Sequence, residues 1–366
     1  MKVGILTFHT AKNIGAQLQA FALTEKLLSL GHKVEIVRYE PAYLSKPYIF
    51  FRNVIFKNGL LSCTKQIFLH LIFDILPWIR TIIHYKYFRN NFLKLSATEY
   101  RDISSLSKGD YDALIVGSDQ IWNPEITDNR LDDFYTLNFD GGNIRKISYA
   151  ASFSSVLMSH KCAQDLAKSI EKFHFVSVRE KELKSFLSAY TNKKIDIVVD
   201  PTLLLDKIEW EKFVGSKRII KEKYVLVYQA RGAKAPILKQ AKQLAEKYHA
   251  IVYDASGMNY RVRHNSVQYV NPIEFLNLVF YAEAIVTVSF HGTAISLILE
   301  KPFYSIVLGD GRDGRVVDLL TSVGLENLLV SSSEELQPQN IDFTEPMKRL
   351  SRLRQQSMQY IENALL

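Results

Sequence analysis

Residues 288–297 read VSFHGTAISL and place a histidine just after an apolar run. The pattern predicts that a strand over 284–288 ends here and a helix over 293–299 begins, so that His291 and Gly292 lie at the turn. Imidazole titrates near neutral pH and can donate or accept a proton, while a helix N-terminus favours an anion beside it. A histidine there can equally well hydrogen-bond a loop carbonyl, and the segment alone leaves both interpretations open.

Arginines that can bind an anion occur in two further segments. Arg179 stands in SVRE at the end of an expected strand, where its planar fork can hold a carboxylate or phosphate. A salt bridge to Glu180 or Glu182 would use the same groups without a ligand. Arg312 and Arg315 stand in GDGRDGR, a glycine-rich segment that can close over an anion or remain a solvated loop.

The loop after the first expected strand, TFHTAKNIGAQLQA, offers polar groups next to a glycine. It lacks the glycine patterns of dinucleotide sites and of P-loop phosphate sites. Gly15 would let a ligand approach backbone amides at a helix start, and Asn13 and Gln17 can hydrogen-bond a sugar. The same residues describe a capped helix with a permissive glycine, and the loop alone favours that plainer interpretation.

The segment GSDQIWNP follows another buried strand and is richer in ligand-binding groups. Asp119, Gln120 and Asn123 can bind hydroxyls, and the flat face of Trp122 can stack on the apolar side of a sugar ring. A tryptophan in such a loop is otherwise a packing anchor. The concentration of polar and amphipathic residues favours a binding site.

The elements that must position these residues alternate between strand and helix. Expected strands are 2–8, 33–39, 111–116, 146–150, 175–178, 196–199, 224–229, 250–254, 284–288 and 303–307. Expected helices are 18–30, 236–248, 272–281, 293–299, 315–323 and 347–366.

Two such series predict an α/β protein with two Rossmann-like domains that face each other over a cleft, and ligands at the carboxyl ends of the strands. We expect the first domain to span 1–210, with a helical insertion at about 44–95, and the second to span 211–346. The last helix, 347–366, is expected to return to the first domain.

Composition excludes several classes of protein. The chain of 366 residues is 47% hydrophobic and 23% charged, as ordinary globular proteins are. Cys63 and Cys162 are too few for a disulfide framework, an iron–sulfur cluster or a structural zinc site, so no metal is expected. The opening MKVGILTFHT lacks the features of a signal peptide and is expected to form a buried strand, which favours a cytoplasmic location.

Most of the net charge of +8 comes from the aromatic-rich segment 44–95, which holds eight Lys or Arg and one acid, Asp74. Polar residues interrupt its apolar part, so it lacks a membrane-spanning stretch. Cations mixed with large apolar residues suit a helix that lies on an anionic lipid surface, but an ordinary insertion packed on its own domain fits the composition as well. No nucleic-acid-binding motif accompanies the charge, and nucleic acid is not an expected partner.

Several segments together resemble the polysaccharide pyruvyl transferase family. They are, in order, NIGAQLQAFAL, VGSDQIWNP, SVRE, DPTLLL, NPIEFLNLVFYAEAIVTVSFHGTAISLILEKPF and GRVVDLLTSVGL. The resemblance runs from about Gly4 to Leu325 and is interrupted by the basic insertion. It implies a glycosyltransferase-B-like arrangement of two Rossmann-like domains.

The resemblance also implies a reaction. Such enzymes transfer the pyruvyl group of phosphoenolpyruvate to two hydroxyls of a sugar in a bacterial surface glycan or its lipid-linked precursor, forming a cyclic ketal and releasing phosphate. Phosphoenolpyruvate is a co-substrate, and no cofactor is expected. The acceptor is expected to be linked to polyprenyl diphosphate, which would give the basic insertion a purpose: peripheral attachment to the inner face of the plasma membrane.

The family's site residues can be carried onto this chain only where its motifs match. His291 corresponds to the proposed general acid or base, and Arg179 and Arg315 to donor-binding arginines. Some members have Arg-Leu-His where this chain has Ser289-Phe290-His291, so one arginine is missing. The full expected donor site is His291, Ser289, Gly292, Arg179, Arg315, Arg312 and Lys301, the last three being candidates to replace that arginine. The expected acceptor site, in the first domain, is Asn13, Gly15, Gln17, Asp119, Gln120, Trp122 and Asn123.

Two other functions fit the same architecture. A glycosyltransferase would bind a nucleotide sugar in the second domain, and a non-catalytic sugar-binding protein would keep the fold without turnover. A flavin or iron–sulfur oxidoreductase is disfavoured by the two lone cysteines and the missing glycine fingerprint.

Overall fold

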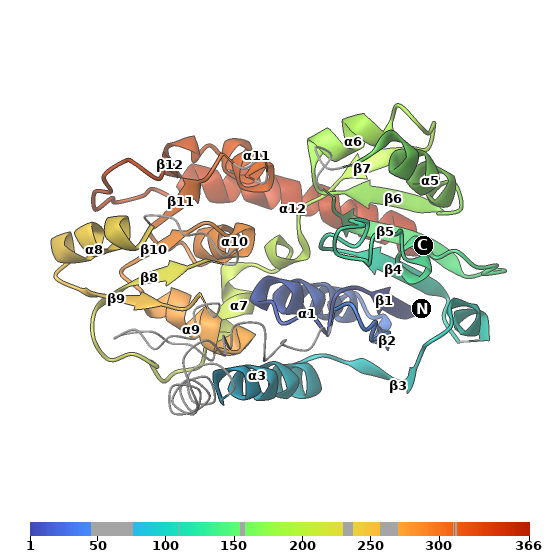
Figure 1. Cartoon of the computed structure of the whole chain (residues 1–366), viewed down its shortest axis with the longest axis horizontal. Helices are drawn as coiled ribbons and strands as arrows, with labels where there is room; N and C mark the ends of the chain where they lie inside the picture. The colour runs from blue at the N-terminus through green and yellow to red at the C-terminus, as the bar shows by residue number, and fades with distance from the viewer. Residues whose placement is uncertain are drawn as a thin grey trace, which may run out of the picture.

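The computed structural model describes residues 1–44, 76–108, 110–153, 158–229, 237–256, 270–309, 311 and 313–366. Two α/β domains, each built on a parallel sheet, lie side by side, with the first on the right and the second on the left of Figure 1. This arrangement confirms the predicted fold class.

The first sheet has the strand order β3-β2-β1-β4-β5-β6-β7 within the described residues. Its strands are β1 (Lys2–Leu6), β2 (Lys33–Arg38), β3 (Leu95–Glu99), β4 (Ala113–Gly117), β5 (Arg145–Ala151), β6 (Phe175–Val178) and β7 (Ile195–Ile197). Its helical elements are α1 (Ile14–Ser29), α3 (Leu76–Phe92), η2 (Ile103–Lys108), α4 (Asp133–Thr136), α5 (His160–Ile170), α6 (Lys181–Leu187) and η4 (Pro201–Leu203). The central strand β4 is buried along its whole length, as a continuous apolar run covered on both faces should be.

The second sheet has the order β12-β11-β10-β8-β9 in the part of the chain that is described. Its strands are β8 (Tyr224–Tyr228), β9 (Ile251–Asp254), β10 (Ala284–Thr287), β11 (Phe303–Val307) and β12 (Leu329–Ser331). The helical elements from the domain junction onwards are α7 (Lys207–Val214), α8 (Ile237–Lys247), α9 (Pro272–Tyr281), α10 (Phe290–Ile298), α11 (Gly314–Val323), η5 (Glu326–Leu328) and α12 (Thr344–Leu365).

One hydrophobic core cluster is continuous across the two domains. It joins α1 and the adjoining face of the first sheet to α7, α9, α10 and α11 of the second half. The last helix, α12, crosses from the second domain to the first (Figure 1), where the Tyr360 hydroxyl donates to the Ser148 carbonyl at 2.8 Å. The domains are therefore held together by shared apolar packing as well as by the chain itself.

The two helices nearest the expected site begin earlier than the sequence suggests. Helix α10 begins at Phe290, with Ser289 as its N-cap, so His291 and Gly292 lie in its first turn and not in a loop. Helix α1 begins at Ile14 instead of residue 18. A capping side chain allows each helix to begin close to the end of the preceding strand, which the apolar periodicity alone does not reveal.

The basic insertion is described in part. Residues 45–75 lie outside the described residues, and α3 accounts for most of the remainder. The insertion is followed by β3, an edge strand of the described sheet that was not predicted from the sequence. Among the described helices, none has both the length and the apolar character needed to cross a membrane.

Helix α12 should contribute to stability through its buried face. Ile361 is 2% exposed and packs in the core cluster shared by both domains. We expect Ile361→Ala to lower the free energy of unfolding by about 2–5 kcal/mol, because the truncation leaves a cavity. Gln355→Ala, on the exposed face of the same helix, should change it by less than about 0.5 kcal/mol. Urea unfolding measures both, and equal effects would contradict the packing described.

Candidate active site

A cavity of about 270 Å³ lies between the two domains at the carboxyl ends of their strands. One wall comes from loops after β1, β2 and β4, and the other from the start of α10 and from α11. The lining residues are Phe8, Ala11, Asn13, Leu44, Asp119, Gln120, Ile126, Ser289, Phe290, His291 and Arg315. The volume is at the lower end of the range for small-molecule sites, so it suits a compact ligand.

Two helix N-termini meet at this cavity. The Asn13 side chain accepts a hydrogen bond from the Ala16 amide at 3.1 Å and caps α1, and the Ser289 hydroxyl accepts one from the Gly292 amide at 3.4 Å and caps α10. Neither helix has an acidic residue in its first turn. Because helix N-termini carry partial positive charge and unpaired amides, the cavity favours an anion.

Gly15 allows the two domains to meet at the histidine. A Cβ atom built on Gly15 would lie 1.9 Å from Nδ1 of His291 and 2.3 Å from its Cγ, well inside van der Waals contact. The imidazole therefore packs directly on the backbone of α1, and only a glycine leaves room for it. Gly15 was predicted to let a ligand approach the helix start, but in this structure the group that approaches is His291.

A buried carboxylate lies behind the histidine. Nε2 of His291 is 3.7 Å from Oδ2 of Asp200, whose side chain is fully buried. Within the described part of the chain, this Nε2 has no hydrogen-bond partner. Burial alone would raise the pKa of Asp200, but His291, Arg179 and the Thr202 amide outweigh burial and hold the pKa well below its usual range. Asp200 is thus an anion that lies close enough to the imidazole to orient it.

Sequence reasoning missed Asp200. The residue closes the strand 196–199 in the segment DPTLLL, and this position after a strand was the available signal. Its Oδ1 accepts hydrogen bonds from the amide and the hydroxyl of Thr202, at 3.0 and 2.7 Å. Its Oδ2 accepts one from the Ser118 hydroxyl at 3.1 Å. These bonds fix the carboxylate before any ligand binds.

Arg179 is committed to protein partners. Its guanidinium donates to Asp200 at 2.5 Å, to Glu180 at 3.1 Å and to the Ser152 hydroxyl at 3.1 Å, and its side chain is 3% exposed. The salt bridge to Glu180 that the sequence left open is therefore present. Arg179 does not line the His291 cavity, but it lines a neighbouring cavity of about 270 Å³ together with Phe290 and Arg315. Its role in donor binding stays a prediction.

The other three cations predicted to bind the donor lie in different places. Arg315, in the first turn of α11, lines the cavity and lies over the Phe290 ring, 6.0 Å from its centroid. Lys301 follows the C-terminal end of α10, roughly 13 Å along the helix axis from the cavity; Pro302 next to it pairs with Ile285 at the amino end of β10. The prediction that Lys301 binds the donor is therefore wrong. Arg312 lies outside the described residues.

The first domain supplies polar groups to the opposite wall. Asp119 and Gln120 line the cavity together with Asn13. The Asn123 side chain is buried and donates to the Gln120 side-chain oxygen at 2.8 Å, so it supports Gln120 and does not face a ligand. Gln17 is also buried, and its amide donates to the carbonyl of Ala11 at 3.1 Å.

The predicted stacking of Trp122 on a sugar is corrected by the structure. Its side chain is 0% exposed and its indole N–H donates to the Tyr135 carbonyl at 3.0 Å. The ring packs edge-on against Phe173. Trp122 is the packing anchor of this loop, since a face enclosed by protein cannot meet a ligand.

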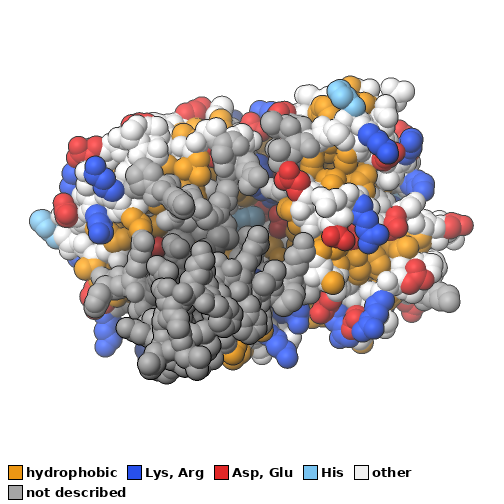
Figure 2. All heavy atoms as spheres, viewed as in Figure 1, with side chains coloured by type: hydrophobic (Ala, Val, Ile, Leu, Met, Phe, Trp, Pro, Cys, Tyr) orange, Lys and Arg blue, Asp and Glu red, His pale blue; other side chains and the backbone are white. Residues whose placement is uncertain are grey.

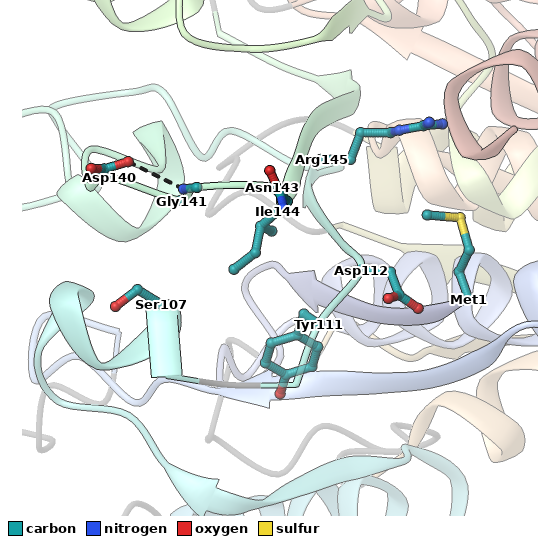
Figure 3. A pocket seen from close by; sticks show the side chains of 10 residues that line it. Met1, Ser107, Tyr111, Asp112, Asp140, Gly141, Asn143, Ile144 and Arg145 are labelled. Atoms are coloured by element: carbon teal, nitrogen blue, oxygen red, sulfur yellow. Dashed lines mark hydrogen bonds between the residues drawn. The ribbon is translucent and has the colours of Figure 1, made fainter.

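A second, open hollow of about 890 Å³ lies at the amino end of the first sheet (Figure 3). Its acidic groups already bind backbone amides: Asp112 accepts from Lys2 at 2.6 Å and Asp140 from Gly142 at 3.2 Å. Ligands of such sheets bind at the carboxyl ends of the strands, so this hollow is not the candidate site. Among the described residues, no cluster of His, Cys, Asp or Glu is arranged to hold a metal ion.

The chain was compared with known proteins by sequence and by structure. The model of the polysaccharide pyruvyl transferase family matches residues 13–310. No curated protein matches the chain by sequence.

Several solved structures resemble the chain at low sequence identity. A UDP-GlcNAc 2-epimerase from Rickettsia bellii is 11% identical, with 99% of this chain and 96% of that chain covered and a TM-score of 0.50. The UDP-GlcNAc 2-epimerase from Methanocaldococcus jannaschii is 14% identical, with 97% and 92% covered and a TM-score of 0.48. The Escherichia coli heptosyltransferase WaaC is 11% identical, with 100% of each chain covered and a TM-score of 0.42. Likeness at these identities concerns the fold alone.

The contact between Gly15 and His291 can be tested by a double-mutant cycle. Gly15→Ala should lower the free energy of unfolding by about 1–3 kcal/mol, because its methyl group collides with the imidazole. His291→Ala in the same chain should recover most of this loss, since alanine leaves room for the methyl group. Gly314→Ala, where nothing lies within 4 Å of the added Cβ, is the control. A double variant as unstable as Gly15→Ala would contradict the contact.

His9, in the loop that lines the cavity, should make stability depend on pH. Burial is the main cause that lowers its pKa from 6.5 to about 4. Below pH 6.5 the unfolded chain therefore binds a proton that the folded chain refuses, and stability falls as the pH drops towards 4. Between pH 7 and pH 5, the free energy of unfolding of the wild type should fall by roughly 2 kcal/mol more than that of His9→Asn. Urea unfolding at both pH values measures this, and parallel losses would contradict it.

Proposed function

The chain belongs to the polysaccharide pyruvyl transferase family and is a transferase, and on this premise we propose that it transfers the pyruvyl group of phosphoenolpyruvate to two hydroxyls of one sugar. The products would be a cyclic ketal on a surface glycan or its lipid-linked precursor, and inorganic phosphate. One observation carries the proposal: a single cavity has His291 and Arg315 on one wall and Asn13, Asp119 and Gln120 on the other.

The second-domain wall suits the donor. Phosphoenolpyruvate is small and carries a phosphate and a carboxylate. The Arg315 guanidinium and the amides at the start of α10 are groups that bind such anions. Ser289 stands where some relatives have an arginine, and it caps α10. The backbone amides at the start of α10 would therefore take over part of the role of the missing arginine.

The histidine suits the proton transfer. Carbon 3 of phosphoenolpyruvate must gain a proton so that positive charge develops on carbon 2. In this proposal protonated His291 supplies it, and Asp200, 3.7 Å from Nε2, stabilises the imidazolium and sets the ring's orientation. Asp200 is a positioning residue here, because it acts through His291.

The first-domain wall suits the acceptor. One sugar hydroxyl adds to carbon 2, the bond from carbon 2 to the phosphate oxygen breaks, and a second hydroxyl closes the ketal ring. One of the two hydroxyl protons replaces the proton given to carbon 3, and the other leaves on the phosphate. Asp119 and Gln120, across the cavity from His291, would accept hydrogen bonds from these hydroxyls and aim them at carbon 2.

The proposal is tested by phosphate release from phosphoenolpyruvate with a panel of lipid-linked and aryl galactosides, glucosides and N-acetylmannosaminides. We expect release with at least one acceptor, and a loss of about 10²–10⁴ in kcat for His291→Ala. Arg315→Gln should mainly raise KM for phosphoenolpyruvate. His160→Ala, an exposed histidine at the start of α5, is the control and should keep the wild-type rate.

Thermal-shift titration distinguishes a pyruvyl transferase from the other two functions. Stabilisation by phosphoenolpyruvate, and not by uridine or guanosine diphosphate sugars, is expected from a pyruvyl transferase. Stabilisation by nucleotide sugars alone would replace the proposal with a glycosyltransferase. Sugar binding without phosphate release from any acceptor would replace it with a non-catalytic sugar-binding protein.

A further inference from the structure

Helix α3 presents large apolar side chains to solvent. Ile79 is 40% exposed, Ile83 58% and Tyr87 55%. Their spacing of four residues puts them on one stripe along the helix, since every fourth residue of an α-helix lies on the same face. A stripe of this kind on a surface helix is unusual unless something binds it.

The opposite face of α3 fixes the helix to both domains. Phe88 is fully buried and packs edge-on against Phe21 of α1. Nδ1 of His84 lies 3.1 Å from a carboxylate oxygen of Glu274 in α9. Figure 1 shows α3 along the margin of the molecule, below α1 and reaching the second domain. The outward stripe is therefore held in place by firm contacts on the other side.

The charge on the outward face is positive. Exposed Arg80 and Lys86 flank the stripe, and α3 contains no Asp or Glu. Figure 2 shows hydrophobic side chains next to Lys or Arg at the place of this helix. Apolar side chains flanked by cations fit an anionic lipid surface, where the cations meet head groups and the apolar groups enter the interface.

We propose that the face of α3 formed by Ile79, Arg80, Ile83, Lys86 and Tyr87 binds the surface of an anionic membrane. A second copy of the chain fits this face less well, because two copies would bring like charges together. Three exposed apolar side chains also offer less area than a stable dimer needs. Charge complementarity therefore favours lipid over another copy of the protein.

The position of α3 relative to the cavity gives this binding a use. Phe88 of α3 packs against Phe21 of α1, and Asn13, the N-cap of α1, lines the cavity. Docking through α3 would hold the cavity near the lipid surface, where a lipid-linked sugar acceptor would be carried. This use rests on the proposed function, but the binding itself does not.

Cosedimentation with vesicles tests the proposal without any turnover. The full chain is mixed with vesicles of phosphatidylcholine alone or with phosphatidylglycerol added. We expect pelleting with phosphatidylglycerol that weakens as salt rises, and little with phosphatidylcholine alone. The double variant Ile83→Ser/Tyr87→Ser should reduce the partition coefficient at least tenfold, and Lys86→Ser should reduce it less.

The matched control is Ile208→Ser, which removes an apolar side chain of 68% exposure from α7 and should pellet like the wild type. Urea unfolding should find all variants as stable as the wild type, because the changed residues are exposed.

Equal pelleting of wild type and double variant would overturn the proposal. So would a wild type that stays in the supernatant, or a dimer that depends on Ile83 and Tyr87. A chain that binds vesicles but releases no phosphate would refute the proposed function alone.

Discussion

The arrangement of the site depends on one buried carboxylate. Asp200 has no exposed surface, and a charge in that position is stable only if it is paired and hydrogen-bonded. Arg179, Ser118 and Thr202 meet this requirement from three different segments of the first domain. Because those bonds fix Asp200, its remaining side faces His291 of the second domain. The buried charge of Asp200 is thus held by residues of the first domain and lies next to His291 of the second.

The second constraint is the close approach of the two domains. The imidazole of His291 lies where a side chain on Gly15 would be, so the N-termini of α1 and α10 come together at one cavity. The partial positive charge of the two helix N-termini and the Arg315 guanidinium make one part of the cavity favourable for an anion. The continuous apolar core behind it keeps the two helices at this separation. The proposed reaction needs proton transfer and anion binding at one place, and His291 and Arg315 line the same cavity.

The two walls divide the polar groups by type. Arg315 and His291 come from the second domain, and Asn13, Asp119 and Gln120 come from the first. On the outside of the same molecule, α3 combines firm inner contacts with an outward stripe of apolar and basic residues. The helix touches both domains through Phe88 and His84. Through Phe21, α3 contacts α1, whose N-cap Asn13 lines the cavity.

The α/β class, the two series of strands and the segments that carry the site were predictable from the sequence, because they follow from apolar periodicity and from capping and glycine residues. His291 was predicted because it follows a buried strand, and Arg315 because it stands in a glycine-rich segment and matches an arginine of the family that the chain resembles. Tertiary structure alone decided which of the other candidates face the cavity. Trp122 and Lys301 are excluded because one is enclosed by protein and the other lies at the far end of α10. Asp200 follows a predicted strand, but its contacts with Ser118, Arg179 and His291 come from segments far apart in the chain. Burial and contact between residues far apart in the chain depend on how the elements pack, and local sequence patterns do not encode that packing.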